Sequence, residues 1–184
     1  MREPISRDAM PQSGIGAQAA AQLITDELSL DGNPLLNLAS FVTTWMDPEA
    51  DQLLADALDK NYIDQEEYPR TSELERRCVS MIAALFHGTS DSVGTSTIGS
   101  SEAIHLAGMA MKRRWKAKVE AAGSTPGTPN LVMSSAVHVT WEKFCRYFEV
   151  ECREVPCEEG RLVLDVAQAV DLIDENTIGV VGIL

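Results

Sequence analysis

The sequence predicts an α/β fold whose mostly parallel sheet lies in the second half of the chain. From residue 130 to residue 184, short apolar runs rich in β-branched residues alternate with helical periodicities. Parallel strands and the helices that connect them follow one another in this order. Before residue 94 the apolar residues recur only at helical spacing, and turn residues separate the periods. A helical segment is therefore expected to precede the sheet.

The chain is expected to comprise three parts. Residues 1–22 form a mobile arm, because Pro and Gly recur there and no helical periodicity begins before Ala19. Residues 23–93 form the N-terminal helical segment. Residues 94–184 contain the incomplete sheet.

Three helices are expected before the sheet. The first covers residues 19–30 and ends at the turn residues that follow it. The second covers residues 48–60 and begins at Pro48, which suits a first helical turn. The third follows Thr71. Five of its residues recur at intervals of three and four and are expected to form a buried stripe: Leu74, Cys78, Met81, Ile82 and Leu85.

The second half is expected to open with a long helix over residues 102–122, which Gly123 closes. The elements expected after it are strand 130–134, helix 137–148, strand 150–155, a hairpin-like segment at 162–164, helix 165–173 and strand 177–184. The last strand is apolar up to the final residue. We therefore expect the chain to stop in the middle of a sheet.

The charge balance argues against several classes of partner. The chain has 28 Asp and Glu residues against 15 Lys and Arg residues, a formal net charge of −13. Nucleic acids and anionic membrane surfaces bind clustered basic residues, so neither is an expected partner. No apolar run is long enough to span a membrane and no secretory leader is evident, so a soluble cytoplasmic protein is expected.

The four cysteines are not expected to carry chemistry. They form no Cys-x-x-Cys pair and no His lies at zinc-finger spacing from them, so no metal site is expected. We interpret them as reduced and mostly buried, with Cys152 or Cys157 as the exposed exception. The aromatic residues Trp45, Trp141 and Phe144 are assigned to the core.

A loop of small residues at 94–99 runs directly into the long helix and forms a candidate anion site. Gly99 lets the backbone approach a ligand closely. Ser100 and Ser101 offer hydroxyls, and the helix start adds free N–H groups and a positive dipole end. A phosphate suits this arrangement best. Helix capping by the two serines is the alternative, and the same residues can serve both roles.

Five sequence blocks carry a family resemblance. They are Asn-Leu-Ala-Ser-Phe-Val-Thr-Thr-Trp-Met at 37–46, Asp-Lys-Asn-Tyr-Ile-Asp-Gln-Glu-Glu-Tyr-Pro at 59–69, Ser-Ser-Glu-Ala at 100–103, Val-Thr-Trp-Glu-Lys-Phe at 139–144 and Asp-Glu-Asn-Thr-Ile-Gly-Val-Val at 174–181. In this order and spacing they resemble the glutamate decarboxylases, which are pyridoxal-phosphate enzymes, over residues 23–184. The resemblance implies the aspartate-aminotransferase-like fold, with residues 94–184 as part of its large, cofactor-binding domain.

The resemblance also assigns candidate cofactor residues. It implies that Ser100 and Ser101 bind the phosphate of pyridoxal 5'-phosphate. It places His138 where the family has the residue stacked on the pyridine ring. We expect Gln there in glutamate decarboxylases and His in related amino-acid decarboxylases, so His138 leaves open a group II decarboxylase with another substrate. Without the resemblance, His138 is interpreted as a solvated residue at a helix start.

Four further residues fall in blocks that resemble the family's pocket for the distal carboxylate of L-glutamate. Ser40 and Phe41 match a pair that touches this carboxylate. Asn61 and Asp64 lie in the block that completes the pocket, partly across a subunit boundary. For Asn61 and Asp64, turn chemistry between two helices is an equally good interpretation.

The resemblance implies an enzyme that converts L-glutamate to 4-aminobutanoate and carbon dioxide and that assembles at least as a dimer. In the family, the lysine that holds the cofactor as a Schiff base lies in a Ser-x-His-Lys segment, which this sequence lacks. The chain is therefore expected to be inactive alone, with no catalytic residue of its own. A non-catalytic fragment that pairs with full-length subunits is a second possibility.

Overall fold

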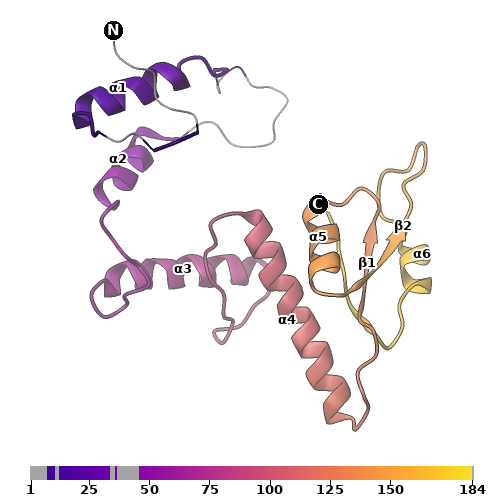
Figure 1. The fold of residues 1–184 in the computed structure, drawn as a ribbon. Coiled ribbons are helices and arrows are strands. Elements are labelled where there is room, and N and C mark those ends of the chain that lie inside the picture. The colour runs from indigo at the N-terminus through magenta and orange to yellow at the C-terminus, as the bar shows by residue number, and fades with distance from the viewer. Residues whose placement is uncertain (1–7, 11–12, 34–35, 37–45, 184) are drawn as a thin grey trace. The chain divides into compact units, whose positions relative to one another are not determined.

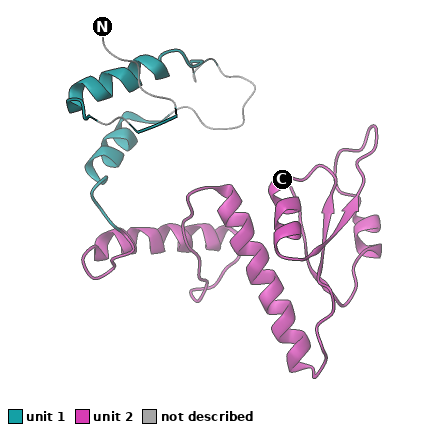
Figure 2. Cartoon of the chain, in the orientation of Figure 1, with its two compact units in different colours: residues 1–61 teal, residues 62–184 magenta. Residues whose placement is uncertain are grey.

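The computed structural model describes most of the chain: residues 8–10, 13–33, 36 and 46–183. The chain divides into two compact units, residues 1–61 and residues 62–184, which Figure 2 shows in two colours. The sheet and the helices that surround it belong to the second unit.

The first unit contains helix α1 (Ala17–Leu28) and helix α2 (Pro48–Asp56). α1 begins two residues before the predicted start. α2 begins at the predicted Pro48, with Glu49 and Asp51 in the first turn, where acidic side chains favour the helix dipole. It ends before the predicted residue 60, and none of the described residues of either helix is buried.

Two long helices open the second unit, α3 (Pro69–Leu85) and α4 (Ser100–Ala121) (Figure 1). α4 ends as predicted, because Gly123 adopts a φ of +76°, which a glycine reaches without strain. The predicted burial of the α3 stripe is wrong for this chain. Cys78 is exposed, and Leu74, Met81, Ile82 and Leu85 are 59% to 77% exposed, since no element of the described chain covers that face.

Three strands form one sheet in the order β2-β1-β3, and all pairs are parallel. Their bounds are β1 (Asn130–Ser134), β2 (Glu151–Val155) and β3 (Thr177–Val180). Helix α5 (Val139–Tyr147) connects β1 to β2, and helix α6 (Val166–Asp171) connects β2 to β3. The two connections run in opposite directions across the sheet, so right-handed crossovers put the two helices on opposite faces (Figure 1).

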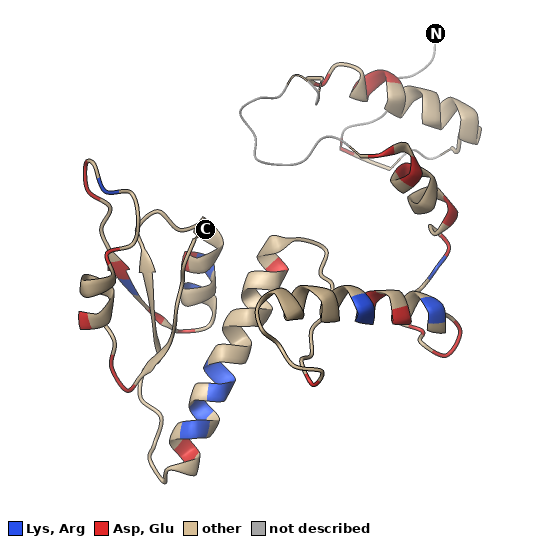
Figure 3. Ribbon diagram, turned by 180° about the vertical axis from the view of Figure 1, so that it is seen from behind, with Lys and Arg blue, Asp and Glu red and all other residues tan. Residues whose placement is uncertain are grey.

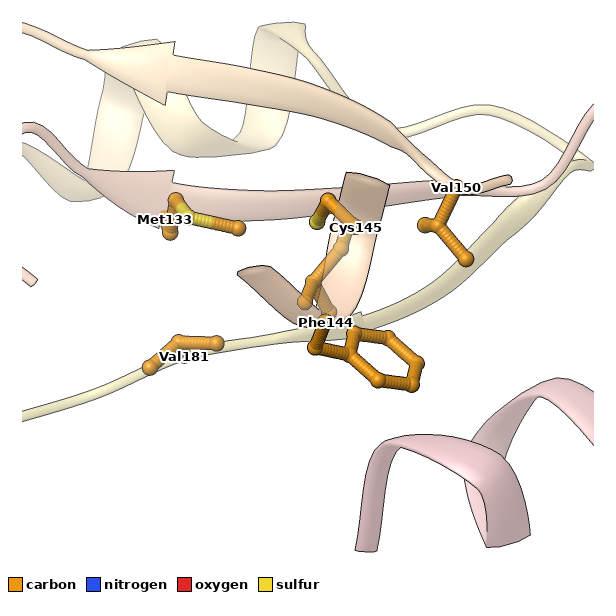
Figure 4. Close-up of a cluster of buried hydrophobic side chains, with 6 residues drawn as sticks. Met133, Phe144, Cys145, Val150 and Val181 are labelled. Atoms are coloured by element: carbon orange, nitrogen blue, oxygen red, sulfur yellow. The ribbon is translucent and has the colours of Figure 1, made fainter. Parts of the chain in front are cut away.

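Each face of β1 carries its own apolar cluster. Leu131 and Met133 pack with residues of α5 and its flanks, and Figure 4 shows the close contact of this cluster: Met133, Phe144, Cys145, Val150 and Val181. Val132 points to the other face, where it packs with Val155 and with Ala169 of α6. All five residues of β1 are buried, and its three central residues, Leu131, Val132 and Met133, are apolar without alternation because both faces of the strand are covered.

Two glycines let α4 lie close to the sheet and to α5. A Cβ on Gly108 would fall 2.5 Å from the Phe144 ring, and a Cβ on Gly179 of β3 would fall 2.7 Å from the Met111 sulfur. Both distances are shorter than any carbon contact that a packed interior tolerates. A Cβ at either position would force the Phe144 ring or the Met111 side chain to shift.

Two further expectations are corrected by the structure. Residues 162–164 form no strand; Leu162 and Val163 are more than 70% exposed, and the turn is instead closed by an antiparallel bridge between Glu158 and Arg161 around Gly160. Of the four cysteines, all of them free, only Cys145 is buried. Cys145 is buried because α5 turns it onto the sheet, whereas Cys152 and Cys157 are half-buried and Cys78 is exposed.

The basic residues gather on the C-terminal half of α4 (Figure 3). Arg113, Arg114, Lys116 and Lys118 are exposed, and Lys116 pairs with Glu120 one turn later. None of the described helices combines the length and the apolar character that a bilayer crossing requires.

Candidate functional site

The start of α4 presents hydroxyls and uncapped backbone. Gly99 is the N-cap and is fully extended, with φ 174° and ψ 166°, and no atom lies within 4 Å of where its Cβ would be. No side chain among the described residues caps the first turn of this helix. Ser100 and Ser101 are exposed. The helix start therefore offers N–H groups, two hydroxyls and a positive dipole end to an anion.

Two carboxylates hold the loop that leads into α4. Glu75 of α3 accepts hydrogen bonds from the Ser96 backbone N–H and hydroxyl, each at 2.8 Å. These bonds lower the pKa of Glu75, the backbone bond most strongly. Glu102 reaches back from the first turn and accepts from the Ile98 N–H at 3.0 Å. The loop is thus fixed by groups other than Ser100 and Ser101.

His138 lies where β1 gives way to α5, at the carboxyl edge of the parallel sheet. It is the N-cap of α5, and its Nδ1 accepts a hydrogen bond from the Thr140 backbone N–H at 3.3 Å. The imidazole is otherwise exposed. This position agrees with the rule that open α/β sheets bind ligands outside the carboxyl ends of their strands.

Thr140 contacts both Ser101, predicted to bind the phosphate, and His138, predicted to stack on the pyridine ring. Its Oγ1 lies 3.2 Å from the Ser101 Oγ, although the two residues are 39 positions apart in sequence. Thr140 is only 2% exposed. The starts of α4 and α5 therefore meet, and two positive helix ends converge beside one anion-sized set of donors. We name Ser100, Ser101, His138 and Thr140 the carboxyl-edge site.

The predicted substrate residues are not assembled in the same way. Ser40 and Phe41 lie outside the described residues, as does Trp45. Asn61 belongs to the first unit and is exposed. Asp64 belongs to the second unit, where its Oδ1 accepts from the Glu67 N–H at 3.1 Å and so forms the turn that opens α3.

A second polar group lies near the ends of β1 and β2. Cys157 donates its N–H to the Ser135 hydroxyl at 2.9 Å, and its sulfur lies 3.2 Å from the Ser134 Oγ. The hydrogen bond with Ser134 is the main cause of a lowered pKa of Cys157. The sequence assigns no chemistry to Cys157. The structure shows that its partners are Ser134 and Ser135.

The opposite, amino edge of the sheet carries a closed polar network. Asn130 donates to Asp174 at 2.8 Å and accepts from the Thr177 hydroxyl at 2.7 Å. Arg153 pairs with the other Asp174 oxygen at 2.7 Å. The bond from Asn130 and then the Arg153 pair hold the pKa of Asp174 down, at about 2. We name Asn130, Arg153, Asp174 and Thr177 the amino-edge network.

A hollow in the described part of the chain also lies at the amino edge. It has a volume of about 980 Å³ and is lined by the C-terminal half of α4 and by the loops around residues 124–127 and 174–178. No residue of the carboxyl-edge site lines it. The candidate cofactor residues therefore form an open surface rather than the wall of this hollow.

Comparisons with known proteins agree with this geometry. Residues 11–184 match the pyridoxal-dependent decarboxylase conserved domain. The chain belongs to this family. Membership confirms the predicted family and the predicted cofactor, pyridoxal phosphate, because this pyridoxal-dependent domain covers almost the whole chain.

The relatives of this pyridoxal-dependent decarboxylase chain include glutamate decarboxylases of plants and bacteria. It is 52% identical to the glutamate decarboxylase of Solanum lycopersicum and 54% identical to glutamate decarboxylase 1 of Arabidopsis thaliana, in each case over 188 aligned residues. All of this chain is covered, but only 38% of each relative. The chain thus spans well under half the length of these relatives.

A solved structure confirms the predicted fold class. Glutamate decarboxylase of Lactobacillus brevis matches 95% of this chain with a TM-score of 0.87 and 42% sequence identity. The match covers 41% of that protein. This chain therefore shares the fold of the corresponding part of that protein.

Sequence reasoning missed three residues that shape the site. Glu75 and Glu102 fix the loop before α4, and Thr140 links that helix to His138. The spacing of Glu102 after the N-cap resembles a capping box and was a usable signal. No local signal marks Glu75 or Thr140, because their partners are 21 and 39 positions away.

Proposed function

We propose that this chain is the part of a glutamate decarboxylase that binds the cofactor phosphate, in an enzyme that converts L-glutamate to 4-aminobutanoate and carbon dioxide. The identity of more than 50% to two plant glutamate decarboxylases supports the reaction and the substrate. The single observation that carries the proposal is the meeting of Ser101 and His138 at Thr140, at the uncapped start of α4.

The residues present fit pyridoxal phosphate. The open space beside Gly99 admits a ligand to the backbone, and no side chain of the described chain competes for the first N–H groups of α4. Ser100 and Ser101 would hold the phosphate as donors, in keeping with the preference of phosphates for helix N-termini. His138 would cover one face of the pyridine ring. All three roles remain part of the proposal.

The chemistry of the site divides between cofactor and protein. When bound, pyridoxal phosphate supplies an electron-withdrawing ring that takes up the electron pair left by the departing carboxylate. Ser100 and Ser101 would hold the anionic end of the cofactor. The His138 imidazole would exclude water from one ring face. Because Nδ1 accepts from Thr140, the neutral ring carries its proton on Nε2, which faces outward as a donor.

The proposal extends to the substrate contacts, the assembly and the location of the protein. Ser40, Phe41, Asn61 and Asp64 are proposed to contact the distal carboxylate of L-glutamate. A homo-oligomer, at least a dimer, is proposed, and the exposed apolar face of α3 is consistent with a surface that another part of the assembly covers. A cytoplasmic location is proposed because all four cysteines are free.

The lysines of this chain do not suit a Schiff base. Lys112 donates to the Phe148 carbonyl, and Lys116 pairs with Glu120. Lys118 and Lys143 are exposed on α4 and α5. An amine in water keeps its proton at neutral pH and is a poor nucleophile. We therefore expect the 184-residue chain to release no carbon dioxide from L-glutamate.

The proposed reaction is tested by carbon dioxide release. A version of the protein extended to the length of its relatives, supplied with pyridoxal phosphate, is assayed with L-glutamate and with aromatic and aliphatic amino acids. Release from L-glutamate above all other substrates supports the proposal. Preference for an aromatic or aliphatic amino acid, which His138 makes the second candidate, would overturn the substrate assignment while leaving the cofactor site intact.

The isolated chain is the control for the lysine argument. Pure chain whose mass is verified is expected to give no release above a reaction without protein. Turnover that is lost on borohydride reduction in the presence of pyridoxal phosphate, or on replacing one of the five lysines, would contradict the view that none of them acts as the Schiff-base residue.

A further inference from the structure

Thr140 differs from the residues it contacts. It is 2% exposed, whereas Ser101 and His138 are exposed. Its hydroxyl and its backbone N–H each make one hydrogen bond, and the two bonds lead to different elements. A buried hydroxyl is almost always paired, and the Ser101 Oγ is the partner that the described chain provides.

The pairing of two hydroxyls decides which of them can donate to a ligand. A hydroxyl has one proton and two lone pairs. If Thr140 donates to the Ser101 Oγ, the Ser101 proton is free to point to an anion at the start of α4. Accepting a hydrogen bond also polarises the Ser101 hydroxyl and strengthens it as a donor. The opposite direction would use the Ser101 proton internally and present only lone pairs to the anion.

The backbone of Thr140 acts on the second group. Its N–H donates to Nδ1 of His138 at 3.3 Å, so the imidazole is held at the N-cap of α5 with its other nitrogen outward. Thr140 therefore contacts both the phosphate hydroxyl and the ring-stacking residue of the proposed cofactor site, from beneath and out of solvent.

We infer that Thr140 is a positioning residue that orients the Ser101 hydroxyl as a donor to the cofactor phosphate and sets the orientation of His138. The inference rests on the proposed function, since it assigns a task to the site named there. Thr140 itself does not touch the cofactor; it acts through Ser101 and His138. The Thr140 side chain is required to orient the Ser101 hydroxyl, and the Thr140 backbone N–H is required to orient His138.

The test uses the full 184-residue chain and pyridoxine 5'-phosphate, which keeps the phosphate and ring but has no aldehyde to react with lysines. Its affinity is measured by isothermal titration calorimetry for the wild type, Thr140→Val, Thr140→Ser, Ser101→Ala and the Ser101→Ala/Thr140→Val double variant. Thr140→Val is expected to weaken binding about 3- to 10-fold, and Thr140→Ser to restore it to within about twofold. The double variant should bind no more weakly than Ser101→Ala alone.

Each outcome separates the inference from the proposed site. Weaker binding by Ser101→Ala with unchanged binding by Thr140→Val would overturn the role of Thr140 and leave the phosphate site standing. No binding by the wild type, or none lost in Ser101→Ala, would overturn the site and with it the inference. Urea unfolding of each variant shows whether Thr140→Val is still folded. If it is not, the affinity of Thr140→Ser for pyridoxine 5'-phosphate decides whether the hydroxyl at position 140 is sufficient.

A second measurement needs no ligand. Nitrogen-15 NMR of the free chain at a pH where His138 is neutral is expected to show the proton on Nε2 and an accepting Nδ1. A proton on Nδ1 would contradict the part of the inference that concerns His138. Thr140→Val should leave this tautomer unchanged, because the backbone N–H remains.

Discussion

The two edges of the sheet use their polar groups in opposite ways. At the amino edge, the amino-edge network bonds to itself, and its central residue Asn130 is fully buried. At the carboxyl edge, Ser100, Ser101 and His138 remain exposed, and only Thr140 is buried beneath them. The same three strands thus end in a closed network on one side and in open donors on the other.

This difference separates stability from binding. Polar groups that bond to one another inside a protein stabilise the fold but have nothing left for a ligand. Polar groups that are left exposed add little to stability and can bind a ligand. Variants of the amino-edge network are therefore expected to change the free energy of unfolding, and variants of the carboxyl-edge site the affinity for the cofactor.

The largest effect on stability is expected for Asn130→Ala. This change leaves buried partners without their hydrogen bonds and is expected to lower the free energy of unfolding by about 2–3 kcal/mol. Urea unfolding followed by the fluorescence of buried Trp115 measures it. Glu175→Gln, at an exposed position of the same edge, is the matched control and should stay within about 0.5 kcal/mol of wild type. Equal effects of both changes would show that the network does not stabilise the sheet.

An acid titration should sharpen the comparison. Asp174 has its pKa lowered from 3.8 to about 2 in the folded chain, so its contribution to stability is complete above pH 4 and is lost as the pH falls toward 2. Asp174→Asn is expected to be less stable than wild type at pH 7 and to lose less stability between pH 4 and pH 2. Urea midpoints measured across this range decide the matter, and parallel curves for the two proteins would exclude Asp174 as the titrating group.

The smallest effect is expected for Glu75→Gln, and it is an effect on cofactor affinity. Glu75 does not belong to the carboxyl-edge site and acts on it through the loop before α4. Glu75 holds the loop before α4 through Ser96, and a neutral amide accepts hydrogen bonds less strongly than a carboxylate. We expect affinity for pyridoxine 5'-phosphate to fall about 2- to 3-fold. Calorimetric titration provides the value, with Glu73→Gln, which faces Arg76 and Arg77 instead, as the control. An unchanged affinity would mean that the loop is held well enough by Glu102.

Much of the sheet could be predicted from sequence because its strands are short, apolar and separated by turn residues. The bounds of β1 are those predicted, since an apolar run of three residues lies between polar residues, after a proline-containing loop. The start of α4 was also predictable, because a glycine followed by two serines at a helix start is a local signal, while its binding of phosphate stays a prediction. Local sequence signals were sufficient wherever the contacts that form an element join residues close together in sequence.

The remaining features depend on contacts that periodicity does not encode. Helical spacing correctly indicated an apolar face on α3, but it cannot say what covers that face, and in this chain Met81 and Leu85 are exposed. The contact of Thr140 with Ser101 joins residues 39 positions apart. The amino-edge network likewise joins the ends of three strands. Such pairs are determined by the topology of the sheet, which a pattern along the chain does not reveal.

The central claim is that the start of α4 binds the cofactor through its phosphate. Its most direct test is a calorimetric titration of the chain and of Ser100→Ala/Ser101→Ala with pyridoxine 5'-phosphate and with pyridoxine, which lacks the phosphate. The account predicts that the double substitution weakens binding of the phosphate ester at least about 10-fold, because hydrogen bonds to a charged group are lost, and that it leaves the weak binding of pyridoxine unchanged. Equal affinity of the two proteins for the phosphate ester would contradict it.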